Sequence, residues 1–302
     1  MRILYVAKHG QQMSGDDEGA ITHALKFLGH SVIPVHENDA EVRVPYERVD
    51  LLLFHKWADP SLLARFKGAK AFWYFDLVDF PDPTLAGRCN QRREWMNRIA
   101  PLVDVGFCTD GDWVSNAPEH YRSKLEWLPQ GADIRVVGPG SEGQIDRADV
   151  LFVGDPKGGQ RRESFHREMQ LKYGARYRNI PFGTYGRRLA DVIANVPIVV
   201  APDGPVTDWY WSNRVYMMVG FGACLVHPYC LGLSKQYSDR LEVSFYNNRD
   251  ELHSHIRYLL ERPAVRRSMA EGALHRTKEQ HLYLHRCQRL IEVVRERGLY
   301  RG

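Results

Sequence analysis

The sequence predicts an α/β protein in which two domains are each built on a sheet of parallel strands. Short apolar runs of strand length alternate with helical patterns and turns, and this alternation favours parallel strands joined by crossover helices. A length of 302 residues with 44% hydrophobic content allows about two hydrophobic cores. Residues 129–146 are dense in turn formers and charge, which is typical of an exposed linker.

The first predicted domain, residues 1–132, has the strand, loop and helix order of a Rossmann-like layer. Its expected strands cover residues 2–7, 30–35, 49–54, 71–75, 103–108 and 125–128, and its helices 16–28, 60–66 and 92–99. After a linker at 133–147, the second domain is expected over 148–265, with strands at 150–154, 197–201, 223–226 and 241–246. The first helix of this domain is expected to end at residue 173, and further helices are expected over 187–194, 211–221 and 249–261. A basic helical tail from 264 to 297 follows them.

Composition limits the class of protein and of partner. The chain begins without a charged and apolar leader and has no apolar run near 18 residues, which predicts a cytoplasmic protein with no membrane span. Five cysteines without metal-ligand spacing predict reduced thiols. The 41 basic and 37 acidic residues leave a formal charge of +4, which fits an anionic ligand, a nucleic acid or an anionic membrane surface, or else an ordinary mixed surface.

Residues 208–228 contain the most informative pattern. The stretch suits a short helix whose start Ser212 or Asn213 can cap and which Gly222 would end, followed by a buried strand. A helix start at the mouth of a parallel sheet offers free backbone N–H groups and a positive dipole end. Arg214 beside it adds a bidentate donor for phosphate oxygens. The predicted ligand is therefore an anion.

This stretch resembles the C-terminal half of two-domain, nucleotide-sugar-dependent glycosyltransferases of the GT-B fold, especially short bacterial and phage members with a family 1 or family 4-like C-terminal domain. Their pattern is similar to Ser-x-Arg-x-aromatic-Glu followed by small residues, Gly, a strand and a turn. Ser212, Arg214, Tyr216 and Gly222 match it. Met217 stands where the family usually has the glutamate that holds the donor ribose, so the way this chain holds a ribose stays open.

A second similarity lies at residues 128–133, whose Leu-Pro-x-Gly-x-Asp step is similar to the end of the first domain in GT-B proteins. The resemblance covers the second domain well and the first weakly. It implies two Rossmann-type domains with parallel sheets facing a central cleft. It also implies that the C-terminal helices, residues 266–302, return to the N-terminal domain, which would present the acceptor.

The donor site is expected at the carboxyl ends of the second domain's strands, where open α/β sheets bind ligands. Residues 154–162 combine glycines, a lysine and paired arginines at a strand-to-helix turn, and the family has a similar Gly-to-Arg arrangement. Arg161 or Arg162 is placed to neutralise a diphosphate leaving group, and a solvated helix start is the alternative. Tyr210 and Trp211 could stack on a base or sugar, or be ordinary core aromatics. The expected donor-binding residues are Gly154, Lys157, Arg161, Arg162, Tyr185, Asp208, Tyr210, Trp211, Ser212, Asn213 and Arg214.

Transfer to a hydroxyl needs a general base within hydrogen-bonding reach of that hydroxyl. Asp76 directly follows the strand at 71–75 and Asp79 comes shortly after, so both are leading candidates, with a helix cap or turn as the alternative role. Some phage DNA glycosyltransferases of similar fold keep a catalytic aspartate in this region. His9 and Asp16 are rival bases from the loop after the first strand, although Asp16 also suits a helix start electrostatically. The expected catalytic residues are Asp76, Asp79 and His9, and the expected acceptor-binding residues are His9, Gly10, Asp16 and Trp57.

No metal is expected. Asp110 and Asp112 form an Asp-x-Asp, but their place after a strand suits capping of the following helix, and the sequence offers no further hard oxygen ligands nearby. The 13 histidines show no zinc-binding pair with a partnering acid.

The resemblance implies transfer of a sugar from a nucleoside diphosphate sugar, with UDP as the expected nucleotide, to an acceptor hydroxyl without a cofactor. Two acceptors stay open: a 5-hydroxymethylpyrimidine in phage DNA, which would make the protein a DNA-modification enzyme, and a saccharide or cell-surface polymer. The DNA acceptor would require base flipping and arginine or lysine contacts to the backbone. The alternatives to transfer are a non-catalytic nucleotide- or DNA-binding module, which Met217 favours, and a nucleotide-sugar epimerase. Oligomeric state and the choice between retention and inversion stay open.

Overall fold

The computed structural model describes residues 1–9, 16–43, 48–143, 148–157, 160–180, 183–184, 186–202 and 204–300. The chain forms two compact units: unit 1 comprises Met1–Ile134 and Tyr283–Gly302, and unit 2 comprises Arg135–Leu282. Each unit contains one parallel sheet with helices packed on it, so the predicted α/β fold class is confirmed. Of the tail that was expected to return as a whole, α12 (Pro263–Gln280) belongs to unit 2 and α13 (Tyr283–Glu296) to unit 1.

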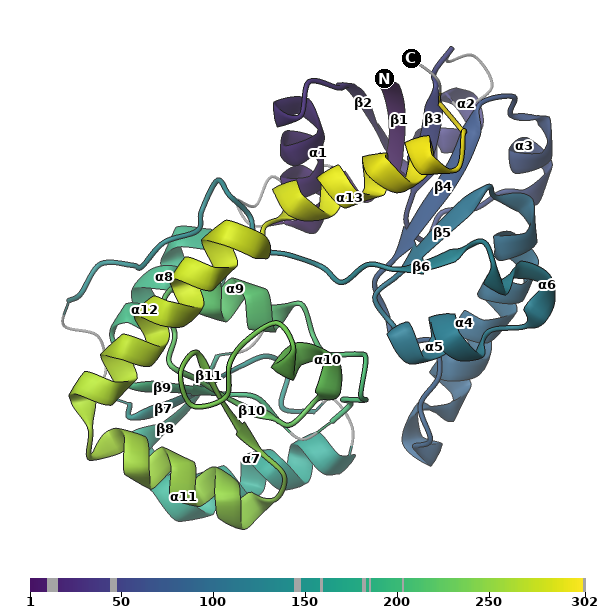
Figure 1. Ribbon diagram of the computed structural model, residues 1–302. Coiled ribbons are helices and arrows are strands. Elements are labelled where there is room, and N and C mark those ends of the chain that lie inside the picture. Colours follow the sequence, from purple (N-terminus) through teal and green to yellow (C-terminus); the bar gives the residue numbers. More distant parts are fainter. Residues whose placement is uncertain are drawn as a thin grey trace. The chain divides into compact units, whose positions relative to one another are not determined.

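Within its described residues, unit 1 holds a six-stranded parallel sheet in the order β2-β1-β3-β4-β5-β6 (Figure 1). The strands are β1 (Arg2–Ala7), β2 (Ser31–His36), β3 (Leu51–Phe54), β4 (Ala69–Tyr74), β5 (Val105–Cys108) and β6 (Leu125–Trp127). Each coincides with a predicted strand, with ends shifted by up to two residues. The predictions hold because apolar runs buried on both faces are typical of parallel sheets.

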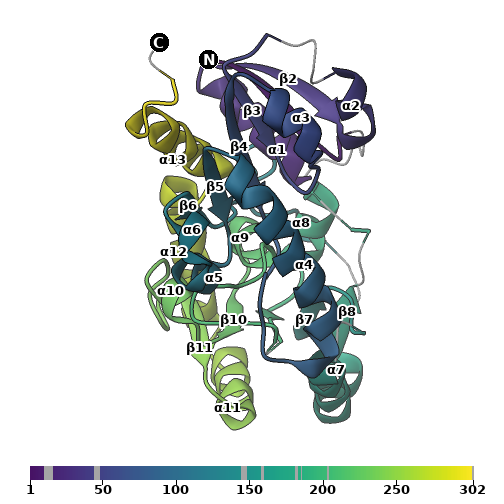
Figure 2. The same ribbon diagram turned by 90° about the vertical axis from the view of Figure 1, so that its right-hand side faces the viewer.

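Helices cover both faces of the unit 1 sheet. Ile3 and Tyr5 point to one face, where α1 (Asp17–Phe27) and α13 complete a core. Leu4 and Val6 point to the other face, over which α3 (Pro60–Arg65) and α4 (Ala86–Ile99) run (Figure 2). The remaining helical segments of this unit are η1 (Glu37–Asp39), α2 (Ala40–Arg43), η3 (Pro83–Leu85), η4 (Ala100–Leu102), α5 (Gly111–Asn116) and α6 (Glu119–Arg122).

Unit 2 holds a five-stranded parallel sheet in its described residues, in the order β11-β10-β9-β7-β8. The strands are β7 (Val150–Val153), β8 (Tyr177–Ile180), β9 (Ile198–Val200), β10 (Leu225–Pro228) and β11 (Val243–Tyr246). The sequence did not predict β8. This edge strand carries Arg178 and Asn179, so it lacks the apolar run that marks the other strands.

One face of the unit 2 sheet packs on α7 (Gln160–Tyr173), α11 (Arg249–Leu260) and α12, through residues such as Phe152 and Val226. The other helical segments are η5 (Gly174–Arg176), α8 (Gly186–Ala194), α9 (Arg214–Gly220) and α10 (Leu231–Ser234). No helix in the described part of the chain is both long and apolar enough to cross a bilayer.

Helix α9 is shorter than the predicted 211–221 but begins and ends as its sequence indicates. The Ser212 hydroxyl accepts the backbone N–H of Arg214 at 3.4 Å, whereas Asn213 occupies the cap position without a side-chain cap bond. Gly222 follows the helix at φ 84°, a left-handed conformation that glycine adopts without strain. Ser212 and Arg214 are thereby held at the carboxyl edge of the sheet.

Candidate functional site

A pocket of unit 2 lies at the point where the direction of chain crossover reverses. From β7 the chain goes outward to β8 and then returns to β9 on the other side of β7. In open parallel sheets, the crevice outside such a switch point is where ligands bind. The pocket there is lined by the ends of β7, β9 and β10 and by the start of α9, and it is partly open to solvent.

Two guanidinium groups line this pocket, from Arg162 of α7 and Arg214 of α9. Burial and, to a lesser extent, the charge of Arg162 lower the pKa of Arg214 to about 10, while Tyr210 opposes the shift. Burial also lowers the pKa of Arg162. The Arg162 Nε is buried and has no hydrogen-bond partner among the described residues, and Nη1 makes one long contact of 3.4 Å to the carbonyl of Asp155. Two partly desolvated cations facing one pocket favour an anionic ligand.

Gly154 makes room for one of these cations. Its φ is 144°, which favours glycine, and a side-chain carbon there would lie 3.3 Å from Nη1 of Arg214 and 3.2 Å from the ring of Phe152. Arg161, in contrast, does not line the pocket and instead packs beside Gly204, whose added carbon would lie 3.3 Å from its Cδ.

The structure brings only part of the predicted donor set to the pocket. Arg162, Ser212 and Arg214 line it. Lys157 and Asp208 are exposed, and the carbonyl of Asp208 accepts the N–H of Gly232 at 2.7 Å. The other described residues of the predicted set also lie outside the lining: Gly154, Arg161, Asn213, Tyr210 and Trp211, of which Trp211 is buried against Tyr216. Tyr185 lies outside the described residues.

Sequence reasoning missed one polar residue of the pocket, His227 at the end of β10. Its side chain is 2% exposed, and its Nδ1 lies 2.7 Å from the carbonyl oxygen of Pro228. Burial lowers its pKa to about 4. The signal available in the sequence was the position of a histidine directly after an apolar strand, at the edge where ligands bind.

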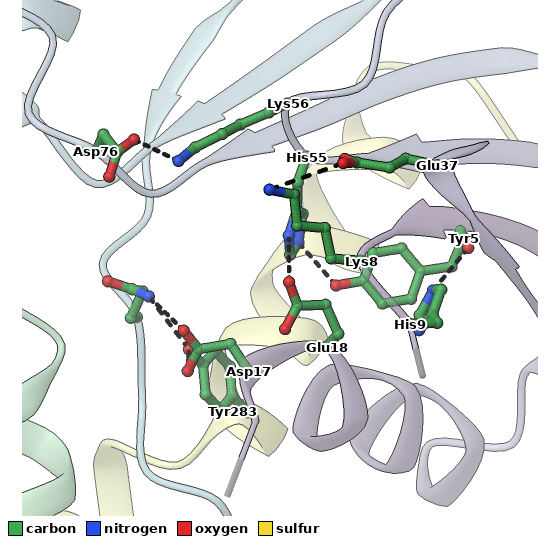
Figure 3. A network of polar contacts seen from close by, with 11 residues as sticks. Tyr5, Lys8, His9, Asp17, Glu18, Glu37, His55, Lys56, Asp76 and Tyr283 are labelled. Carbon is green, nitrogen blue, oxygen red and sulfur yellow. Dashed lines mark hydrogen bonds and ion pairs between the residues drawn. The ribbon is translucent and has the colours of Figure 1, made fainter. Parts of the chain in front are cut away.

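Unit 1 has its own switch point between β1 and β3, and a network of polar side chains lies there (Figure 3). The Tyr5 hydroxyl lies 2.7 Å from Nε2 of His55, and Nδ1 of His55 lies 3.8 Å from a carboxylate oxygen of Glu18. His55 is 7% exposed, and Tyr5 is fully buried. β1, β3 and the start of α1 thus converge on one network.

Burial and the pairing of His55 with Glu18 decide the charge states in this network. Burial raises the pKa of the Tyr5 hydroxyl well above its ordinary range, and it lowers the pKa of His55 against the opposing influence of Glu18. For Glu18, burial raises the pKa, but the nearby His55 ring outweighs burial and the pKa is lowered. At neutral pH, the Tyr5 hydroxyl therefore donates a hydrogen bond to Nε2 of a neutral His55, whose Nδ1–H faces an ionised Glu18.

His9 lies beside this network with one nitrogen engaged. Its Nε2 lies 2.9 Å from the backbone carbonyl of Tyr5, so Nε2 carries the proton and Nδ1 is a hydrogen-bond acceptor when the ring is neutral. Burial lowers the pKa of His9, and the nearby carboxylates of Glu18 and Asp16 oppose that shift. His9 is therefore an unprotonated base at neutral pH.

The other predicted residues of unit 1 have varied surroundings. Asp76 forms ion pairs with Lys56 at 2.6 Å and with Arg92 at 3.5 Å. Asp79 pairs with Arg93 on α4, and its side chain is about half exposed. Asp16 occupies the N-cap position of α1 without a side-chain cap bond, Trp57 packs edge-on against Phe54, and Gly10 lies outside the described residues.

A second set of bonds ties α13 to the start of α1. The Tyr283 hydroxyl donates to Asp17 at 2.7 Å (Figure 3). The Gln130 amide donates to the same carboxylate at 3.1 Å. Arg286 in turn donates to the carbonyl of Gln130 at 3.0 Å. Residues far apart in the sequence thereby fix the helix that carries Glu18.

Asp110 has the capping role that its position predicts. Its carboxylate accepts the N–H of Trp113 at 3.0 Å and that of Val78 at 2.8 Å, and burial raises its pKa. Among the residues that the structure describes, no three His, Cys, Asp or Glu side chains gather as a metal site would require.

Comparison with known proteins agrees with this architecture. The sequence profile of a family described as glycosyl transferase-like matches residues 129–292. Sucrose-phosphate synthase from Thermosynechococcus elongatus has a similar structure, with a TM-score of 0.71 at 12% identity over 98% of each chain. HepE from Anabaena, solved in complex with UDP-glucose, has a TM-score of 0.65 at 11% identity over 98% of this chain and 100% of its own. OtsA without ligand has a TM-score of 0.65 at 11% identity over 100% of both chains.

A search among curated proteins found no match to the sequence. The solved structures share the GT-B fold with this chain, and the profile match covers more than half of its length. The chain belongs to the glycosyl transferase-like family and is a glycosyltransferase of the GT-B fold.

Proposed function

We propose that the protein transfers a glycosyl group from a UDP-sugar to an acceptor hydroxyl, and that the pocket of unit 2 binds the diphosphate of the donor. The observation that carries the proposal is the pair of guanidinium groups, Arg162 and Arg214, at the switch point of a parallel sheet. UDP as the nucleotide is supported by HepE, a similar structure that was solved with UDP-glucose and with UDP.

The chemistry required of this pocket is stabilisation of a leaving group. The bond between the anomeric carbon and a β-phosphate oxygen breaks, and the acceptor oxygen forms a new bond to that carbon. Negative charge then grows on the departing diphosphate. Fixed guanidinium groups in a partly desolvated pocket stabilise this charge more strongly than water does. Ser212, which lines the same pocket, adds a hydroxyl donor for a phosphate oxygen.

The acceptor hydroxyl must also lose a proton, and we assign this role to unit 1. His9 is the better candidate of the predicted bases, because it is unprotonated at neutral pH and its Nδ1 is an acceptor. Asp76 and Asp79 rank below it, since each carboxylate is engaged by cationic side chains.

We consider two classes of acceptor: a 5-hydroxymethylpyrimidine in DNA and a saccharide. The test is an assay of UDP release and product formation, in which purified protein is incubated with labelled UDP-glucose and, separately, other labelled nucleotide sugars. Duplex DNA with hydroxymethylated cytosine or uracil, the same duplex without these groups, and a panel of oligosaccharides serve as acceptors.

Incorporation of label only into the hydroxymethylated duplex would identify DNA as the acceptor, and incorporation into an oligosaccharide would identify a saccharide. Tight binding of nucleotide sugars without hydrolysis or transfer to any acceptor would contradict the proposed function.

A further inference from the structure

The polar side chains of the unit 2 pocket offer more hydrogen-bond donors than acceptors. Its lining has four polar side chains among the described residues: Arg162, Arg214, Ser212 and His227. Guanidinium groups only donate hydrogen bonds, and the Ser212 oxygen already accepts the N–H of Arg214. His227 is therefore the side chain whose contribution to ligand binding is decided by its protonation and tautomer.

The tautomer of His227 follows from its hydrogen bond. Its Nδ1 lies 2.7 Å from the carbonyl oxygen of Pro228, and a carbonyl oxygen only accepts, so Nδ1 carries the proton. Burial lowers the pKa to about 4, which keeps the ring neutral at physiological pH. Nε2 then has a free lone pair, and no described residue forms a hydrogen bond with it. His227 is a hydrogen-bond acceptor in a pocket otherwise equipped to donate.

A nucleoside diphosphate presents complementary chemistry. Its diphosphate oxygens only accept hydrogen bonds and suit the two arginines, whereas its ribose hydroxyls, a few bonds away, can donate. The transferred sugar has hydroxyls too, but it must stay reachable by an acceptor. His227 is 2% exposed, which suits the part of the ligand that takes no part in the reaction.

We propose that Nε2 of His227 accepts a hydrogen bond from a ribose hydroxyl of the donor nucleotide. The assignment rests on the proposed function, because it needs a nucleotide whose diphosphate is held by Arg162 and Arg214. It makes His227 a residue that selects ribonucleotides over their deoxy counterparts.

The experiment compares, by titration calorimetry, the affinity of each protein variant for each of four ligands. The ligands are UDP, 2′-deoxy-UDP, 3′-deoxy-UDP and inorganic pyrophosphate. The variants are His227→Phe, which keeps a ring but removes the acceptor, and His227→Gln, which restores an acceptor oxygen. His166→Phe removes a partly buried histidine of α7 that does not line the pocket and serves as the control.

In the unchanged protein we expect one of the deoxy nucleotides to bind about tenfold more weakly than UDP. The His227→Phe variant should lose about tenfold in UDP affinity, should not discriminate against that deoxy nucleotide, and should bind pyrophosphate normally. His227→Gln should recover part of the discrimination. The His166→Phe control should match the unchanged protein.

Undiminished discrimination by the His227→Phe variant would overturn the assignment, as would equal binding of all three nucleotides by the unchanged protein. The pyrophosphate arm separates the two claims. If the unchanged protein binds UDP and pyrophosphate but His227→Phe changes neither the UDP affinity nor the discrimination between nucleotides, only this inference is overturned. Absence of both UDP and pyrophosphate binding would overturn the proposed function as well. Normal pyrophosphate binding by the His227→Phe protein would show that the variant is folded, so a loss of discrimination in it could be assigned to the missing acceptor.

Discussion

Arg162 and Arg214 come from different helices of unit 2 and line the same pocket, where the charge of Arg162 adds to burial in lowering the pKa of Arg214 to about 10. Holding two cations together costs stability unless an anion lies between them. The pair is therefore typical of a functional site, where groups that lower the stability of the free protein raise its affinity for a ligand.

The first prediction concerns the stability that the free protein loses by holding Arg162 and Arg214 together. Arg162→Met removes one charge and a buried Nε that has no partner among the described residues. We expect the free protein to be more stable by about 1 kcal/mol, since an unsatisfied buried donor is lost, and UDP affinity to fall at least tenfold. Urea unfolding and calorimetry measure the two quantities. Arg167→Met, on the exposed side of the same helix, should change neither; a less stable Arg162→Met protein would contradict the prediction.

The second prediction concerns the backbone next to Arg214. Gly154→Ala places a carbon 3.3 Å from the guanidinium at a φ of 144°. We expect a loss of stability of about 1–3 kcal/mol and weaker UDP binding, because both the backbone and the arginine must shift. Thermal unfolding and calorimetry provide the measurements. Gly87→Ala, on α4 with nothing within 4 Å, should be neutral or slightly stabilising. Equal behaviour of the two variants would show that Gly154 is not constrained.

The third prediction concerns pH. In the unfolded chain a histidine titrates near pH 6.5, whereas folded His227 has a pKa of about 4. Between these values the unfolded state binds a proton that the folded state does not, so stability falls as pH drops, by up to about 1.4 kcal/mol per pH unit. The His227→Phe protein should lose this part of the slope in urea unfolding between pH 6.5 and 4.

The control for the pH experiment is His275→Ala, whose side chain is 74% exposed. It should keep the slope of the unchanged protein. An unchanged slope in the His227→Phe protein would mean that His227 titrates normally in the fold.

The fourth prediction ranks His9 above Asp76 as the general base. His9→Gln should lower kcat by about 10²–10⁴ and leave UDP affinity unchanged, because a general base acts on the chemical step. Asp76→Asn should have the smaller effect, since its carboxylate already pairs with Lys56 and Arg92. His23→Gln, an exposed position on α1, is the control. Steady-state transfer assays decide the order, and a larger loss for Asp76→Asn would reverse the assignment.

Much of the fold could be predicted because buried parallel strands have a simple signature. The apolar runs of β1, β3, β4 and β7 are read directly from the sequence, and Gly222 marks the end of α9 through its positive φ. β8 escaped because an edge strand with Arg178 and Asn179 shows no apolar run. Local patterns find an element only where its burial is reflected in its own residues.

The candidate site was harder to predict because it depends on which distant residues meet. Ser212, Arg162 and Arg214 were identified from motif and position, and all three line the pocket. Arg161 was indistinguishable from its neighbour Arg162 in the sequence, since only the fold shows that Arg162 lines the pocket and Arg161 does not. His227 had a local signal, its place directly after an apolar strand, whereas the bonding of His55 with Tyr5 depends on strand order, which no local pattern encodes.

The most direct measurement is calorimetric titration of UDP into the unchanged protein and into the Arg214→Ala and Arg167→Ala variants. We expect the unchanged protein and Arg167→Ala to bind with equal affinity and Arg214→Ala to bind at least tenfold more weakly, in keeping with a charge-assisted hydrogen bond worth about 1.5–3 kcal/mol. Equal affinity of all three proteins, or no binding by the unchanged protein, would contradict this expectation.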